Sequence, residues 1–310
     1  MAHVTAVNIS EKKGVRKHEV PYIDVKCHHG IVGDAHAGDW HRQISLLAEE
    51  SVDTMRAVCP IVLEQLGFRV RLGTFLGQDD VSNLCRRLLD QRGFSSYDEF
   101  AQDNPDPVVV TSVFSWEHDR GFLAHNEGVY ESILDPETVY GFLRDAKVVF
   151  APVGQPEVTR RLHEEGVKVV YDSGWSDDLS IDGIKAFLPY IDVYTPNDKE
   201  ARKLAGTDDL EEAVRFLAGY TPHPVVTLGK GGCAYWHDGS IRYVSAIDEF
   251  RAVDTTGAGD NFLTGIIYGL LTEEPLDRCV RLGNIFAGKS TTAVGCFGAA
   301  VTPALIRKYL

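Results

Sequence analysis

The order of apolar and polar residues changes character along this chain. From about residue 146 onward, short runs rich in β-branched residues alternate with stretches whose apolar residues recur at helical spacing. Strands that alternate with helices predict a parallel sheet with crossover helices on its faces. The runs expected to form strands are residues 147–150, 167–171, 193–195 and 225–228.

The helical stretches complete this pattern. A hairpin is expected after the helix at residues 210–219, because Asp238 and Gly239 favour a two-residue turn between residues 234–237 and 241–244. The predicted fold is therefore α/β, with a central, mostly parallel sheet flanked by helices. The expected helices are residues 156–165, 181–190, 198–205, 210–219, 257–271, 275–294 and 303–310.

The first part of the chain has a different pattern. Strand-like runs within residues 1–59 are not spaced as βαβ units. We therefore predict two domains, residues 1–59 and 60–310. No repeat, low-complexity tract or Pro/Ser-rich linker marks the junction, so it is expected to be short and direct.

Composition and charge exclude several classes of function. The 310 residues are 44% hydrophobic and 25% charged, as in ordinary globular proteins. The net charge of −14 disfavours a nucleic acid or an anionic membrane as partner. With no run of about 18 apolar residues and no signal-like start, a cytoplasmic location is expected. The six cysteines contain no CxxC pair and are expected to be reduced thiols.

The most informative segment is DTTGAGDNF, residues 254–262, at the start of a predicted helix. Glycines allow the backbone to approach a ligand, and the unpaired N–H groups of a first helical turn favour an anion. Gly257, Ala258 and Gly259 are thus candidates for an anion hole around a transferring phosphoryl group. Asp260 can accept a proton from the attacking hydroxyl as a general base. An Asp that caps a Gly-rich turn explains the same residues, so this segment alone leaves both interpretations open.

Two further motifs allow the same pair of interpretations. Asn197 and Glu200 can organise Mg²⁺ through water, or they can form a helix N-cap and its capping-box partner. Residues 225–232, VVTLGKGG, place a Gly-rich turn after a strand, at the sheet edge where open α/β folds bind ligands. The same turn is also typical of the start of a hairpin.

Together the motifs resemble the ribokinase-like carbohydrate kinases of the PfkB family over about residues 60–310. DTTGAGD is similar to that family's C-terminal signature, and Asn197 with Glu200 to its NxxE element. The resemblance implies ATP- and Mg²⁺-dependent phosphorylation of a hydroxyl group on a sugar or nucleoside-like molecule, with Asp260 as the base. It also implies that Asn197 and Glu200 hold Mg²⁺ indirectly, that Asp254 belongs to a K⁺ loop and that the chain forms a homodimer. The implied nucleotide contacts are Asn197, Glu200, Thr227, Gly229, Gly232, Thr256 and Asn284.

Other segments extend the resemblance. Residues 63–80 are similar to the family's helix, strand and GxxGDD turn, and residues 119–122 to an edge of its sugar site. Asp172 ends a predicted strand where the family often has an Asp near the phosphates. Gly298 and Ala299 fall where the family lines its adenine pocket.

Residues 283–290 formally satisfy the P-loop pattern GxxxxGK[ST]. A true P-loop follows a strand and opens a helix, and its lysine, here Lys289, contacts the terminal phosphates. The residues before this segment have helical spacing instead. We therefore interpret the match as a coincidence in the middle of a helix.

The N-terminal segment competes with the kinase interpretation. Residues 29–47 resemble the start of a MOSC domain, and the similarity extends over residues 1–56 without that domain's second half. The kinase family's first strand and GGxxxN element have no counterpart there, which implies an incomplete or altered lid region. Two alternatives stay open: a nucleotide-binding remnant without activity, or a molybdenum-cofactor or sulfur-related role. The candidate metal ligands for that role are Cys27, His28, His29, His36 and His41, although scattered histidines are more often hydrogen-bonding groups.

Overall fold

The structure is a computed structural model. It describes residues 58–100, 108, 134–152, 154–174 and 178–310, and in addition the backbone of six strands that pair as antiparallel hairpins. These strands are β1 (Val7–Ile9), β2 (His18–Val20), β3 (Val25–Lys26), β4 (Gly30–Ile31), β7 (Val110–Trp116) and β8 (Asp119–His125). The MOSC-like segment and its candidate metal ligands therefore lie outside the described residues, apart from the backbone of β1 to β4.

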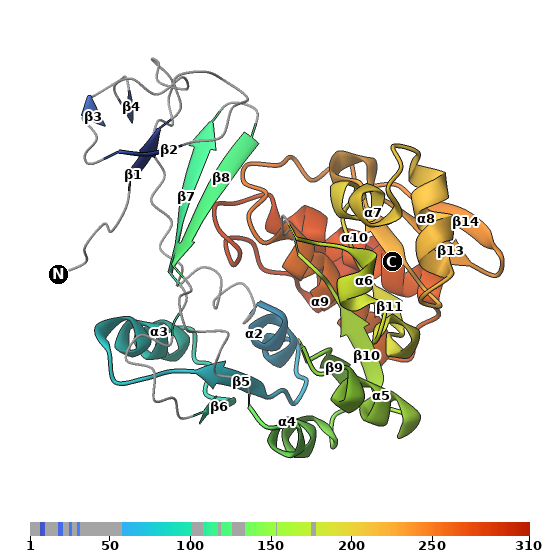
Figure 1. The fold of residues 1–310 in the computed structure, drawn as a ribbon, viewed down its shortest axis with the longest axis horizontal. Helices are drawn as coiled ribbons and strands as arrows, with labels where there is room; N and C mark the ends of the chain where they lie inside the picture. The colour runs from blue at the N-terminus through green and yellow to red at the C-terminus, as the bar shows by residue number, and fades with distance from the viewer. Residues whose placement is uncertain are drawn as a thin grey trace.

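A largely parallel sheet forms the centre of the described chain (Figure 1). β9 (Val148–Phe150), β10 (Lys168–Tyr171) and β11 (Val193–Tyr194) pair in parallel, in the order β11-β10-β9. Single parallel bridges then join Tyr194 to Pro224 and Asn197 to Thr227. They bring β12 (Val225–Thr227) beside β11, and the antiparallel strands β13 (Cys233–His237) and β14 (Ser240–Val244) follow. The predicted sheet is confirmed.

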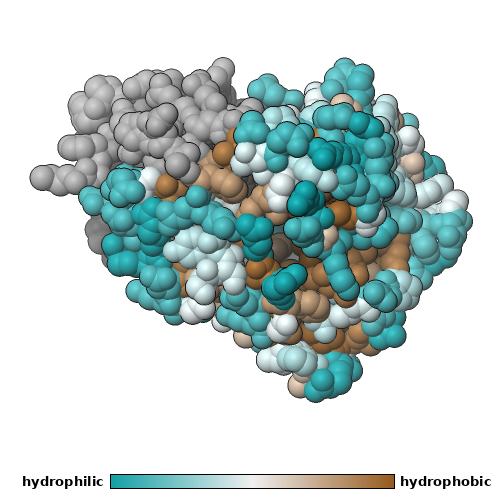
Figure 2. All heavy atoms as spheres, turned by 90° about the horizontal axis from the view of Figure 1, so that it is seen from below, coloured by the Kyte–Doolittle hydropathy of each residue, from teal (hydrophilic) through white to brown (hydrophobic). Residues whose placement is uncertain are grey.

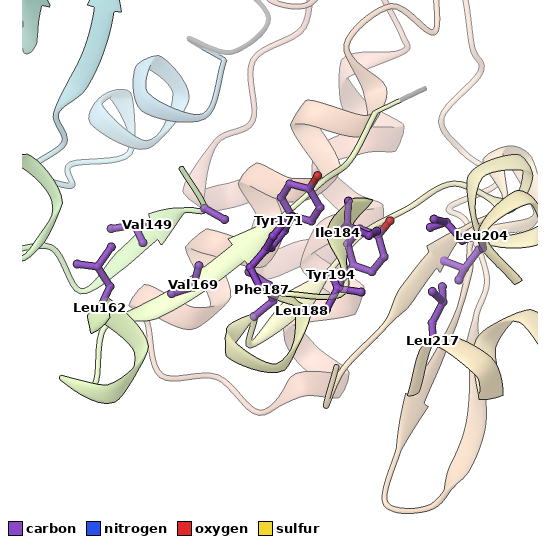
Figure 3. Close-up of a cluster of buried hydrophobic side chains, with 14 of the residues drawn as sticks. Val149, Leu162, Val169, Tyr171, Ile184, Phe187, Leu188, Tyr194, Leu204 and Leu217 are labelled. Atoms are coloured by element: carbon purple, nitrogen blue, oxygen red, sulfur yellow. The ribbon is translucent and has the colours of Figure 1, made fainter. Parts of the chain in front are cut away.

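Alternating side chains of the strands enter two different cores. Val169, Tyr171 and Tyr194 pack on one face of the sheet, where Figure 3 shows them among the apolar side chains of the flanking helices. Val170 and Val193 point to the opposite face. Because neighbouring residues of a strand face opposite ways, strands buried on both sides must be apolar throughout. This explains the continuous apolar runs in the sequence.

Helices cover both faces of the sheet, which gives three layers. The face with Tyr171 is covered by α4 (Pro136–Leu143), α5 (Pro156–Glu164), α6 (Ile181–Ile184), α7 (Asp198–Ala205) and α8 (Leu210–Ala218). The other face is covered by α2 (Val58–Gln65), α9 (Ala258–Leu271) and α10 (Leu276–Ser290), and α11 (Pro303–Tyr309) packs on α10. A parallel pair, β5 (Leu72–Phe75) and β6 (Tyr97–Phe100), flanks α3 (Asp80–Gln91) in sequence.

Two predicted helices are longer than the observed ones. The helix expected over residues 181–190 ends as α6, and a 3₁₀ turn at Leu188–Tyr190 follows it. Pro189 lies in that 3₁₀ turn and has no N–H to donate to the Lys185 carbonyl, so the α-helix cannot continue through it. The helix expected to reach residue 294 ends at Ser290, where Ser290 and Thr291 donate hydroxyl hydrogen bonds to carbonyls three residues earlier.

The predicted hairpin is confirmed, whereas the predicted domain boundary falls within a helix. The turn between β13 and β14 has positive φ at both Asp238 (48°) and Gly239 (76°), as a type I′ turn requires. α2 begins at Val58, so one helix crosses the domain boundary predicted at residues 59 and 60.

The surface and the helix lengths complete the description. None of the helices in the described ranges is long and apolar enough to span a bilayer. Seen from below, the surface is largely hydrophilic, with apolar residues gathered toward the middle and lower right of that face (Figure 2).

Candidate active site

The carboxyl ends of three neighbouring strands bring polar residues to one edge of the sheet. Asp172 follows β10 directly, Asn197 lies three residues after β11, and Thr227 ends β12. A parallel bridge pairs Asn197 with Thr227, and the Thr227 N–H donates to the Pro196 carbonyl at 3.0 Å. The carboxyl edge of a parallel sheet is where open α/β folds bind ligands. The residues predicted from three separate motifs therefore meet at a suitable place.

The N-terminus of α9 lies at the same edge. Gly257 precedes the helix with φ 72° and no side-chain cap, so it holds the left-handed conformation that glycine tolerates. A Cβ built on Gly259 would lie 3.9 Å from Asp172 Oδ2, which places the Asp172 carboxylate beside the first turn. The first N–H groups of α9 lack intrahelical partners and favour an anion there. Gly257, Ala258 and Gly259 thus occupy the position expected of an anion hole.

Contacts of Asn261 and Cys296 hold Gly257 at the start of α9. The Asn261 side chain donates from Nδ2 to the Gly257 carbonyl at 2.9 Å and to the Cys296 carbonyl at 3.2 Å. A Cβ on Gly257 would lie 2.8 Å from Cys296 Sγ, closer than real Cβ contacts allow. Glycine is therefore required at position 257 for space as well as for its backbone conformation.

Asp260 lies in the first turn of α9 and is half-buried. Its backbone carbonyl accepts from Thr264 Oγ1 at 2.7 Å and from the Cys59 thiol of α2 at 3.4 Å. The negative charges of Asp260 and Asp172 both act on Cys59. Both carboxylates therefore lie near the place where α2 meets α9.

Asp172 and Glu200 are two carboxyl groups whose ionisation is disfavoured mainly by burial. Burial, together with the nearby charge of Asp172 and against the hydrogen bonds from Asn197, raises the pKa of Glu200 to about 7. Burial also raises the pKa of Asp172 to about 6, although the Gly174 N–H donates to its Oδ1 at 3.0 Å. Two buried carboxyl groups at one sheet edge fit a divalent cation, which takes oxygen ligands and would favour their ionised forms.

The capping-box interpretation of Asn197 and Glu200 is confirmed as local geometry. Asn197 Oδ1 accepts from the Glu200 N–H at 3.0 Å, and Glu200 Oε2 accepts from the Asn197 N–H at 2.9 Å. The cap holds the Glu200 carboxyl, which is only 3% exposed, at the start of α7. The two interpretations are therefore compatible, because the cap positions the carboxyl that is the candidate for indirect Mg²⁺ binding.

The glycine-rich loop after β12 bends tightly against β14. Gly229 has φ 56° and begins a 3₁₀ turn, and the Leu228 N–H donates to the Gly232 carbonyl at 2.8 Å. Gly232 has φ 87°, and a Cβ there would lie 2.0 Å from the Val244 carbonyl oxygen. Only glycine fits at position 232. This loop leaves the sheet at the edge that carries Thr227, as the sequence predicts for a nucleotide-contacting turn.

Asp254 joins the loop before α9 to the segment after α10. Its Oδ1 accepts from the Thr256 N–H at 2.9 Å and from Thr256 Oγ1 at 2.8 Å, and its Oδ2 accepts from the Gly295 N–H at 2.9 Å. The N–H groups of Val253 and Asp254 donate to the Thr291 carbonyl. The hydroxyl of Thr256 is thus directed to Asp254. These contacts give the predicted cation loop a defined shape.

Two residues of α10, Asn284 and Lys289, belong to sequence motifs that are associated with nucleotide binding. Asn284 is 6% exposed, and its Nδ2 donates to the Val244 carbonyl at 3.1 Å and the Ser245 carbonyl at 3.3 Å. This amide nitrogen holds the end of β14, so its donors do not face a ligand pocket. The P-loop-like residues 283–290 lie inside α10, with no strand before them. Lys289 is the second-last residue of α10 and so does not stand at the start of a helix, where a P-loop lysine would lie.

Sequence reasoning did not identify three residues that build this site. Cys59, Asn261 and Cys296 contact the start of α9, and two of them are distant from it in sequence. A buried cysteine has no periodic or motif signal that indicates such a contact. Of these three residues, only Asn261 could have been identified from a motif, because it directly follows the GAGD string.

Comparisons with known proteins agree with the C-terminal part of this description. The pfkB family carbohydrate kinase model matches residues 156–302. The cytidine kinase of Thermococcus kodakarensis is 32% identical over 148 residues, which are 45% of this chain and 53% of that kinase. The matches to the first four curated relatives cover 42 to 54% of each relative, so the chain spans about half of their length.

Solved structures agree over a larger part of the chain. The ribokinase of Arabidopsis thaliana, complexed with ribose and ATP, has a TM-score of 0.68 at 21% identity and covers 82% of this chain and 85% of its own. A putative ribokinase II from E. coli, in complex with ATP and Mg²⁺, has a TM-score of 0.65 at 16% identity over 82% of this chain and 87% of its own.

The MOSC-like resemblance finds no support in these comparisons. The fold of the chain is ribokinase-like, and its residues 156–302 match the model of the pfkB family carbohydrate kinases.

Proposed function

We propose that this protein is an ATP-dependent kinase that phosphorylates a hydroxyl group of a sugar or a nucleoside-like molecule. One observation carries the proposal: Asp260 lies in the first turn of α9, directly after the three small residues Gly257, Ala258 and Gly259, at the helix end that favours an anion. Asp172 and Glu200 stand at the same sheet edge with raised pKa values. The relatives named above include a cytidine kinase and a ribokinase holding ribose and ATP.

Each of these residues has a separate role in the proposed reaction. Asp260 accepts the proton of the acceptor hydroxyl as its oxygen attacks the γ-phosphorus and ADP leaves. The N–H groups of Gly257, Ala258 and Gly259 stabilise the charge that develops on the transferring phosphoryl oxygens. When bound, Mg²⁺ neutralises phosphate charge, and Glu200, Asn197 and Asp172 are the residues that would hold it, directly or through water.

The remaining assignments belong to the same proposal. Thr227, Gly229 and Gly232 form the turn under the nucleotide, and Thr256 and Asp254 shape a loop that takes K⁺. Asn284 is proposed to support the nucleotide pocket by fixing the end of β14, because its amide nitrogen donates to the Val244 carbonyl. Residues 60–310 are proposed as the kinase core, which Val58 and Cys59 join through α2, and the preceding part of residues 1–59 as a separate segment. A homodimer is proposed as its assembly, which light scattering tests.

The test is product formation by the purified full chain. ADP release and the phosphorylated product are measured by mass spectrometry with MgATP and K⁺ against pentoses, ketohexoses and nucleosides. We expect one class of acceptor to gain 80 Da of phosphate and release one ADP per product. ATP binding without any phosphorylated acceptor would contradict the proposal and favour a nucleotide-binding remnant.

The third interpretation has its own test. A molybdenum-cofactor or sulfur-related role through residues 1–56 predicts bound molybdenum or pterin in the purified protein. Elemental analysis and fluorescence of the native preparation measure both. Stoichiometric molybdenum would favour this role over the kinase.

A further inference from the structure

Cys59 of α2 joins the first turn of α9 through a small polar cluster. Its Sγ lies 3.4 Å from the Asp260 carbonyl oxygen and 3.0 Å from Thr264 Oγ1. Thr264 Oγ1 is itself 2.7 Å from the same carbonyl oxygen. The three atoms close a triangle between two helices whose residues are about 200 positions apart in sequence. The main chain of Asp260 is therefore tied to α2.

The thiol acts as a donor in this cluster. Burial raises the pKa of Cys59 to about 12, and the charges of Asp260 and Asp172 raise it as well. Such a thiol keeps its proton at neutral pH, so it can donate a hydrogen bond and is a poor nucleophile. The Thr264 hydroxyl is fully buried and lies within donating distance of both Cys59 Sγ and the Asp260 carbonyl, so the thiol proton is left for that carbonyl.

We propose that Cys59 is a positioning residue for Asp260, an inference that rests on the kinase function proposed above. α9 begins without a side-chain cap, so its first turn depends on contacts from outside the helix. Asn261 and Cys296 hold Gly257 on one side of this turn. Cys59 and Thr264 hold the Asp260 carbonyl, and so fix the Cα from which the carboxylate extends. Since a displacement of about 1 Å can cost 10²-fold in rate, this support affects turnover.

Three variants and one control test the role. Cys59→Ala removes the donor, and Cys59→Ser replaces it with a hydroxyl. Cys279→Ala is the control, because Cys279 is a free cysteine that, like Cys59, bonds a carbonyl, that of Glu274 at 3.3 Å, within the far end of the α9–α10 layer. Cys59→Val, which fills the space without a donor, replaces Cys59→Ala if that variant does not fold.

The readout is kcat per ATP-binding site, with ATP affinity measured separately by calorimetry. Cys59→Ala should lower kcat about tenfold and change the Kd for ATP less than about twofold, because the base moves while the nucleotide site stays. Cys59→Ser should recover kcat to within about threefold of the wild type, and Cys279→Ala should leave kcat unchanged. A purely structural role would lower the melting temperature of Cys59→Ala without changing kcat per site.

Three outcomes would overturn the inference. The first is a wild-type kcat per site in Cys59→Ala, and the second is a Cys59→Ser variant as slow as Cys59→Ala. The third is a shifted lower limb in the pH profile of Cys59→Ser, which would make the thiol itself a titrating group in the reaction. A wild-type chain that binds ATP but phosphorylates no acceptor would instead overturn the proposed function, and with it this inference.

Discussion

The Glu200→Gln substitution should stabilise the metal-free protein above neutral pH. Glu200 is 3% exposed and has its pKa raised by burial from 4.5 to about 7, with the charge of Asp172 adding to the effect. A carboxyl group with a higher pKa in the folded chain keeps its proton longer when folded. Its contribution is therefore fully present below about pH 4.5 and is lost as the pH rises through 7. Glutamine has no proton to lose and can still accept from the Asn197 N–H.

The magnitude follows from the two pKa values. Raising a pKa from 4.5 to about 7 corresponds to roughly 3 kcal/mol of folding free energy between mildly acidic and mildly alkaline pH. Wild type should lose this stability between pH 4.5 and 8, and the variant should not. Mg²⁺ should return part of it to the wild type, since a cation that binds only the folded state stabilises that state.

Urea unfolding in EDTA at pH 4.5, 6 and 8 measures the difference between the two chains. We expect the variant and the wild type to be similar at pH 4.5 and the variant to be more stable by roughly 3 kcal/mol at pH 8. Turnover should change the opposite way, because the variant has lost a Mg²⁺-organising carboxylate. Equal pH dependence in the two chains would refute the argument that burial of this carboxyl controls its charge.

Three further substitutions test the geometry of the site. Gly257→Ala should lower kcat and the melting temperature together, because the new Cβ would lie 2.8 Å from Cys296 Sγ at φ 72°; unchanged thermal unfolding would contradict this. Gly232→Ala should destabilise the chain by about 2 kcal/mol or more in urea unfolding, since its Cβ would meet backbone at 2.0 Å. Asp254→Ala should abolish activation of turnover by K⁺, measured against Na⁺, because it removes the contacts to Thr256 and Gly295; retained K⁺ activation would exclude the loop.

Much of the sheet could be predicted because its strands are buried on both faces. Val169 and Val170 enter different cores, so the run must be apolar at every position, and such a run is visible in sequence. α7 runs from Asp198 to Ala205, as predicted, because both of its ends carry local signals. Asn197 caps the N-terminus, and Gly206 adopts φ 67° at the C-terminus. The end of α10 at Ser290 depends on hydroxyl groups that bond back to carbonyls of the helix. This signal was too weak to predict the helix end from the sequence.

The candidate site could be predicted only where its signals are local. The GAGD string and the Asn197–Glu200 pair are contiguous motifs, so residue order alone locates them. The support for these motifs comes from contacts across most of the chain, such as that of Cys59 with the Asp260 carbonyl, 201 residues apart. Asn284 was assigned to a pocket by resemblance to a family pattern, which gives no information about its hydrogen bonds to the Val244 and Ser245 carbonyls.

Asp260 is the residue on which the whole account depends. Asp260→Asn keeps the size and hydrogen-bonding capacity of the side chain but removes its ability to accept a proton. The decisive measurement is the rate of acceptor phosphorylation by this variant at saturating MgATP, beside its Kd for ATP. We predict a loss of about 10²- to 10⁴-fold in kcat with a Kd for ATP close to that of the wild type. A variant that phosphorylates the acceptor at the wild-type rate would contradict the assignment of Asp260 as the general base.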